Sequence, residues 1–284
     1  MEKNRKMSLV LMYITNIPQV ALIAEKNGVD RIWIDLETLG KEERQKGMNT
    51  VKSKHSIEDI KKIKSVLSKS DLMVRINPWN ENSRKEIDSV INAGADIIML
   101  PMWKTKEEVE SFIQYVDGRV KTNLLLETKE AAECLDEVLK VDGIDEIHIG
   151  LNDLHLSYGL TFMFELLSNG TVESLCNKIK KCNIPYGFGG IAKIGEGMLP
   201  AEKVILEHYR LGSTRAILSR SFCNTDEIES IEKIEEVFSK NMKVLREYES
   251  HINECDIECF SKNKQNVKKM VQMIVDKKRE DKWS

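Results

Sequence analysis

Short apolar runs alternate with amphipathic segments along most of the chain. In three places a helix-like segment ends in glycine, one spacer residue and an aspartate follow, and a β-branched apolar run comes next: residues 24–37, 91–101 and 140–150. Glycine in that place suits the left-handed residue that commonly ends a helix. The apolar runs have the length and continuity of strands buried in a parallel sheet. The pattern therefore predicts repeated helix–strand units.

Eight strands of this kind are expected, with helical segments between them. They are Leu9–Ile14, Arg31–Leu36, Leu72–Ile76, Ile97–Leu100, Asn123–Leu126, Glu146–Ile149, Pro185–Phe188 and Ala216–Leu218. This order favours a (β/α)8 TIM barrel, of class α/β, over an open doubly wound sheet. A dinucleotide-binding sheet would carry GxGxxG directly after its first strand, whereas the glycine-rich run of this chain, residues 187–197, lies at the seventh.

The composition changes after about residue 225. Residues 225–284 keep a helical period but are highly charged and longer than one closing barrel helix requires. We expect the barrel domain to span residues 8–224 and the rest to form an extension of one or two helices. Packing against another subunit, which would make the protein a homo-oligomer, and a solvated extension are both open for this segment.

Composition narrows the class of protein. The 284 residues are 41% hydrophobic and 31% charged, which is typical of a globular chain and not of a disordered one. A formal net charge of −3 gives no basic excess for binding nucleic acid, and no apolar stretch approaches the roughly 20 residues of a membrane span. The apolar run near the N-terminus is too short for a secretion signal. Six scattered cysteines indicate reduced thiols, so we expect a cytoplasmic protein.

Polar side chains at the carboxyl ends of the strands are the candidates for chemistry, because barrel enzymes place their working residues there. Glu127 and Asp153 follow consecutive predicted strands. Two carboxylates with waters suit Mg²⁺ or Mn²⁺, which take their remaining ligands from water and substrate. The alternative is a pair of solvated acids. Asn152 and the backbone of Gly150 are further candidates for binding a substrate.

Arg75 ends the third strand and is a natural partner for a substrate carboxylate, which a guanidinium grips through two hydrogen bonds. The alternative is a structural ion pair with Asp35 or Glu37. The loop that follows the second strand, Gly40 to His55, is rich in basic residues and includes Arg44. It is either a segment that closes over an anionic substrate or an ordinary solvated loop.

The end of that loop carries a candidate base. His55 is a possible mobile base, and it directly precedes Ser56, which is a plausible N-cap for the next helix. A neighbour of a helix cap with no chemical role is the alternative interpretation of His55.

Five segments together resemble the HpcH/HpaI aldolase/citrate lyase family of the phosphoenolpyruvate/pyruvate superfamily. They are DLE after strand 2, VRIN at strand 3, AGADIIMLPM at strand 4, LLET at strand 5 and GIDEIHIGLNDLHLSYG at strand 6. The motifs stand in the family's order and on the predicted strands, and the resemblance covers about residues 8–224.

The resemblance implies a divalent-metal-dependent carbon–carbon lyase, or aldolase, acting on a 2-oxo acid or related carboxylate through a metal-bound enolate. By the same resemblance Glu127 and Asp153 would hold the metal, and Arg75 would bind the carboxylate and help to stabilise the enolate. Family members are typically oligomers with exchanged C-terminal helices, so the resemblance also implies at least a dimer.

The sequence departs from the family at the end of strand 2. Pyruvate aldolases of the family read Asp-Gly-Glu-His there, with the histidine as general base, and citrate-lyase-like members read Asp-Leu-Glu-Asp. This chain has Thr38 in the last of the four positions. We therefore look to Glu37, His55 or a metal-bound water for the base. Two alternatives follow: a citrate-lyase-like acyl-CoA ester lyase, and a barrel that binds a metal and an oxo acid without turnover.

Overall fold

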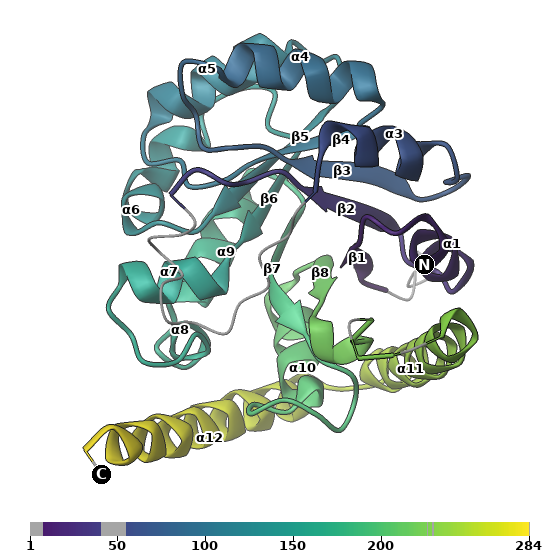
Figure 1. The fold of residues 1–284 in the computed structure, drawn as a ribbon. Coiled ribbons are helices and arrows are strands. Elements are labelled where there is room, and N and C mark those ends of the chain that lie inside the picture. The colour runs from purple at the N-terminus through teal and green to yellow at the C-terminus, as the bar shows by residue number, and fades with distance from the viewer. Residues whose placement is uncertain (1–7, 41–54, 226, 229, 284) are drawn as a thin grey trace, which may run out of the picture. The chain divides into compact units, whose positions relative to one another are not determined.

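A computed structural model describes residues 8–40, 55–225, 227–228 and 230–283 of the chain (Figure 1). The chain divides into two compact units, one of residues Met12–His148 and one that joins Met1–Leu11 to Ile149–Ser284.

Eight parallel strands form a closed barrel in chain order, which confirms the predicted (β/α)8 architecture. The strands are β1 (Val10–Ile14), β2 (Arg31–Asp35), β3 (Asp71–Arg75), β4 (Ile97–Leu100), β5 (Lys121–Leu126), β6 (Glu146–Ile149), β7 (Tyr186–Ile191) and β8 (Arg215–Leu218). Each predicted strand overlaps an observed one. The largest difference is at β7, which continues three residues beyond the predicted end.

Side-chain alternation along β2 turns three residues into the barrel. The Arg31 side chain contacts Glu146 of β6, and because β2 and β6 are not neighbouring strands, this contact crosses the interior. Residues two apart on a strand share a face, so Trp33 and Asp35 point the same way. Asp35 pairs in register with Arg75 of β3, which brings these two side chains together at the carboxyl ends of their strands.

The helices of Met12–His148 follow their strands on the outside of the sheet (Figure 1). They are α1 (Pro18–Lys26), α3 (Ile57–Lys64), α4 (Ser83–Ala93), α5 (Lys106–Val116) and α6 (Lys129–Val138). The predicted cap at Ser56 is confirmed: its hydroxyl accepts from the backbone N–H of Asp59, and the Asp59 carboxylate accepts in return from the Ser56 backbone N–H at 2.9 Å. This capping box satisfies N–H groups that a helix start otherwise leaves without partners.

The second unit carries the remaining helices, which are α7 (Leu151–Ser157), α8 (Glu165–Ser168), α9 (Thr171–Lys181), α10 (Ala201–Leu211), the 3₁₀ turn η1 (Arg220–Phe222), α11 (Ile231–Ile252) and α12 (Ile257–Trp283). The predicted extension is thus two helices. Val267, Val271 and Val275 of α12 are buried, and this helix packs on α8 and α10. Within the described ranges no helix combines the length and apolar character needed to cross a membrane.

Candidate active site

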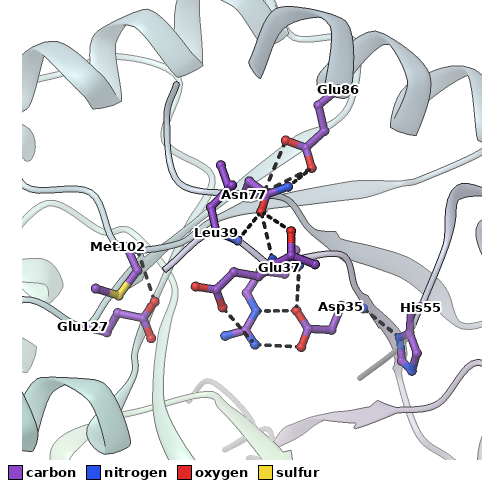
Figure 2. Close-up of polar contacts among 10 residues, drawn as sticks. Asp35, Glu37, Leu39, His55, Asn77, Glu86, Met102 and Glu127 are labelled. Carbon is purple, nitrogen blue, oxygen red and sulfur yellow. Dashed lines mark hydrogen bonds and ion pairs between the residues drawn. The ribbon is translucent and has the colours of Figure 1, made fainter. Parts of the chain in front are cut away.

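An arginine held between two carboxylates occupies the ends of β2 and β3. Arg75 donates from Nε to Asp35 Oδ1 and from Nη2 to Asp35 Oδ2, both at 2.9 Å, and Nη2 lies 3.3 Å from Glu37 Oε2 (Figure 2). Both carboxylate side chains are 2% exposed. The ion pair with Asp35 and Glu37 that the sequence left open is therefore present. These contacts use Nε and Nη2 of Arg75, and Nη1 makes no hydrogen bond to any of the described residues.

Carboxylates lie around this arginine. Burial alone would lower the pKa of Arg75, but the charges of Asp35 and Glu37, the hydrogen bond that Arg75 donates to Asp35 and the charge of Glu127 raise it. The guanidinium also lies 5.1 Å from the ring centroid of Trp33, a favourable cation–π arrangement. Arg75 thus lies among three carboxylates, those of Asp35, Glu37 and Glu127.

Glu127 directly follows β5 and is positioned by backbone. Its Oε1 accepts from the backbone N–H of Met102 at 3.2 Å (Figure 2). Met102 has a φ of 54°, which is uncommon for a residue with a side chain. The next residue, Thr128, caps α6 with its hydroxyl and also donates to the Trp103 carbonyl at 2.9 Å. The glutamate is 3% exposed and sits on a well-fixed turn.

His55 contacts the same strand end. Its Nδ1 lies 3.0 Å from the backbone nitrogen of Asp35 and accepts the hydrogen bond (Figure 2). Acceptance requires the lone pair of Nδ1, so the neutral ring carries its proton on Nε2. The histidine is thus oriented as a hydrogen-bond donor through Nε2.

The other predicted site residues belong to the second compact unit. Gly150 is the N-cap of α7, and Asn152 and Asp153 lie in the first turn of that helix, half-buried. His155 on the next turn is buried, and its Nδ1 contacts the carbonyl of Asn152. This places the three predicted residues at a helix start that follows directly from β6.

The structure therefore brings together Arg75, Glu37, His55 and Glu127 within Met12–His148 and gathers Gly150, Asn152 and Asp153 in the other unit. Arg44 lies outside the described residues. Among the residues that are described, no group of three or more His, Cys, Asp or Glu side chains is close enough to hold a metal ion.

Sequence reasoning assigned no polar role to three contributors to this site. Asn77 and Glu86 hold the end of β2 through the contacts drawn in Figure 2. Met102 contributes through its backbone N–H, which any residue type except proline would supply. Asn77 does stand in the VRIN motif, and that position is the signal that would have found it.

Comparison of the chain with known proteins identifies the same family that the sequence motifs resemble. The model of the family HpcH/HpaI aldolase/citrate lyase matches residues 9–165. The chain belongs to this family. Membership supports an enzyme of the carbon–carbon lyase kind, acting on a small carboxylate, in a family whose aldolases are generally dependent on divalent metals.

Solved structures with the same fold are only distantly related in sequence. An HpcH/HpaI aldolase from Desulfitobacterium hafniense is 15% identical with a TM-score of 0.60, over 84% of this chain and 93% of that one. Citrate synthase SbnG is 16% identical with a TM-score of 0.56, over 86% and 95%. Macrophomate synthase is 14% identical with a TM-score of 0.53, over 75% and 78%. The comparison with curated protein sequences gives no significant match.

Proposed function

We propose that the protein is a divalent-metal-dependent carbon–carbon lyase that acts on a 2-oxo acid through its enolate. Two findings support the proposal: membership of a lyase and aldolase family, and the buried cluster of Arg75 with the carboxylates of Asp35, Glu37 and Glu127. Membership of the family is the observation that carries it.

The residues fit a hard divalent cation. The cluster offers carboxylate oxygens, which are the ligands that Mg²⁺ and Mn²⁺ prefer. We assign Glu127 and Asp153 as the metal ligands, following the positions of the family's motifs. When bound, such an ion acts as a Lewis acid that stabilises negative charge on the keto oxygen of the substrate.

Arg75 is proposed to bind the substrate carboxylate through Nη1 while Asp35 fixes the guanidinium from the other side. Bidentate pairing with Asp35 holds the plane of the fork, so its remaining donors point in a set direction. Gly150 and Asn152 are proposed as further substrate contacts.

The cluster also predicts an order of binding. An anionic oxo acid is proposed to bind to the cation as well as to Arg75, so the cation should bind before the oxo acid or with it. Oxalate, a stable analogue of an enolate, should therefore bind measurably in calorimetry only when Mg²⁺ or Mn²⁺ is present. Equal binding of oxalate in EDTA would contradict the assignment.

Proton transfer is assigned to Glu37 and His55. Glu37 would take a proton from the substrate, because its carboxylate lies beside the guanidinium of Arg75 that is proposed to bind the substrate. His55 would donate a hydrogen bond through Nε2, because its Nδ1 is engaged with Asp35. Asparagine also accepts through one atom and donates through another, so His55→Asn should retain activity within about tenfold, whereas His55→Ala should lose about 10²-fold or more. Equal losses would indicate that His55 acts as a base.

Exchange of the methyl protons of pyruvate tests the proposal most directly. In D₂O with Mg²⁺ or Mn²⁺, the proton lost to the base is replaced by deuterium, which NMR detects. We expect exchange in the wild type, none in EDTA, and none with Glu127→Gln. Glu130→Gln is the matched control, since Glu130 lies exposed in the same segment. The absence of exchange in the wild type would refute enolate chemistry with pyruvate.

A citrate-lyase-like reaction on acyl-CoA esters is the second candidate. The Asp35-Leu36-Glu37 motif favours it, because citrate-lyase-like members of the family read Asp-Leu-Glu in those positions. Calorimetric binding of coenzyme A, with no pyruvate methyl exchange, would select this reaction. Metal-dependent oxalate binding with neither activity would indicate a barrel that binds without turnover.

A further inference from the structure

The strand end that carries Glu37 is fastened to the end of β3 by one amide side chain. Asn77 Oδ1 accepts from the backbone N–H of Thr38 at 2.9 Å, from the Thr38 hydroxyl at 3.2 Å and from the backbone N–H of Leu39 at 3.0 Å (Figure 2). Thr38 and Leu39 are exposed. These donors lie at the surface, so the asparagine replaces solvent as their acceptor and helps to hold the backbone in place.

Glu86 sets the orientation of that amide. Asn77 Nδ2 donates to Glu86 Oε1 at 2.8 Å, and the Asn77 backbone N–H donates to the same carboxylate at 3.2 and 3.3 Å. An ionised carboxylate only accepts, so it selects the NH₂ end of the asparagine and leaves the oxygen facing Thr38 and Leu39. Glu86 lies in the first turn of α4 and is half-buried.

These contacts complete an unbroken series along the chain. The backbone N–H of Leu36 donates to the Arg75 carbonyl at 2.9 Å, and that of Glu37 donates to Asp35 Oδ1 at 3.2 Å. The next two N–H groups, of Thr38 and Leu39, are those that donate to Asn77. Four consecutive backbone donors are therefore fixed, and Glu37 stands in the middle of them.

Position 38 takes a different role from the one the family resemblance implies for its aldolases. The histidine expected there is replaced by Thr38, whose hydroxyl and backbone N–H both donate to Asn77. The side chain is thus used to hold the backbone, and the adjacent Glu37 contacts Arg75.

We propose that Glu86 and Asn77 act as a pair of positioning residues that hold Thr38 and Leu39 and thereby keep the Glu37 carboxylate beside Arg75. The proposal rests on the proposed function in one respect, the action of Glu37 and Arg75 on the substrate. The pair touches neither the substrate nor the reacting atoms and acts through the backbone.

Exchanging the two side-chain types provides the test. Asn77→Asp sets two carboxylates against each other and removes the donor that Glu86 needs. Glu86→Gln removes the charge that orients the amide. The double variant restores the hydrogen bond between positions 77 and 86 with the amide and the carboxylate exchanged. The amide introduced on α4 donates to one oxygen of the carboxylate introduced after β3. The other oxygen of that carboxylate accepts from Thr38 and Leu39. Asn80→Asp is the matched control: Asn80 lies in the same connection but bonds to Pro78 and Asn82.

Hydrogen exchange on peptides that span residues 36–39 measures how firmly the backbone hydrogen bonds of Thr38 and Leu39 are held, and it requires no enzymatic turnover. We expect exchange to accelerate about tenfold or more in Asn77→Asp, to return to within about threefold of wild type in the double variant, and to be unchanged in Asn80→Asp. Unchanged exchange in Asn77→Asp, or no recovery in a double variant that melts like the wild type, would overturn the proposal.

Kinetics then separate positioning from a purely structural role. Displacing a catalytic group by about 1 Å lowers the reaction rate on the order of 10²-fold. Asn77→Asp should therefore lower kcat for methyl exchange about 10- to 100-fold with KM changed less than about threefold, and the double variant should recover most of it. An unchanged kcat despite faster amide exchange would overturn the positioning role. If the wild type does not exchange methyl protons, the proposed function fails, and the amide-exchange cycle still decides whether the pair holds Thr38 and Leu39.

Discussion

The ion pair inside the barrel at the start of β2 should respond to mutation in a strongly non-additive way. Arg31 donates from Nη1 and Nη2 to the two oxygens of Glu146, at 2.5 and 2.6 Å, and both side chains are about 5% exposed or less. Asn123 Nδ2 adds a weaker contact to Glu146 at 3.3 Å. The pair has near-ideal fork geometry, so the two charges satisfy each other almost completely.

Removing one partner leaves the other charged and buried. Arg31→Met or Glu146→Leu alone should each cost about 3–5 kcal/mol, which at roughly 2–4 °C per kcal/mol lowers the melting temperature by about 10 °C. The double variant removes both charges and fills the space with apolar groups. Its main loss is the acceptor of Asn123, about 1–3 kcal/mol, so it should be more stable than either single variant.

Thermal and urea unfolding, followed by tryptophan fluorescence, measure the cycle. Trp33 and Trp103 are buried and report on the same unit. Lys140→Met is the control, because Lys140 and its partner Glu137 are 64% and 59% exposed and their ion pair should contribute little. A double variant that loses the sum of the two single losses would refute the reasoning, since it would mean that the two charges do not compensate each other.

Three further predictions concern other parts of the chain. Glu249→Gln should cost about 2–3 kcal/mol in thermal unfolding, because the carboxylate accepts from the Leu9 backbone N–H at 2.8 Å and pairs with Arg246 at 2.7 Å; a loss no larger than that of the exposed Glu247→Gln would contradict this. Gly187→Ala should cost more than about 3 kcal/mol, since a Cβ there would lie 2.4 Å from the Arg215 carbonyl oxygen, while Gly159→Ala, with open space and a φ of 65°, should cost only about 1–2 kcal/mol. Burial raises the pKa of Glu86 above its usual 4.5, although hydrogen bonds from Asn77 oppose the shift. The folded state then holds this proton more tightly than the unfolded state, so stability falls as pH rises from about 4.5 through the raised pKa. Glu86→Gln should flatten that part of the stability–pH curve, and an unchanged slope would count against the assignment.

The strands were predictable because burial imposes an apolar pattern on them, but their ends were not. The apolar pattern stops at Phe188, whereas β7 runs to Ile191. Glycines without side chains allow β7 to approach β8 closely at Gly187, and a glycine run in a sequence is more typical of a loop. Gly143 is similar: its φ of 93° is left-handed as expected, but α6 already ends at Val138. Glycine in this place marks a turn and not the helix end.

The site was predictable only where strand ends determine it. Asp35 and Arg75 are the last residues of paired strands in register, so their meeting follows from the fold. The backbone N–H of Met102 leaves no trace in the residue type. Glu86 occupies an ordinary half-buried position on an amphipathic helix, where glutamate is common, and only the loop geometry reveals its contact with Asn77.

Position in the barrel separates the two ionic clusters of Met12–His148. At the strand starts, Arg31 pairs with the buried Glu146, and Asp71 lies within 4 Å of both Arg31 and the exposed Lys121. Opposite charges paired in near-ideal geometry suit a structural role. At the strand ends, Arg75 contacts Asp35 and Glu37 and is influenced by the charge of Glu127. Similar residue types thus have different consequences, because the second cluster lies at the end of the barrel where enzymes of this fold carry out their chemistry.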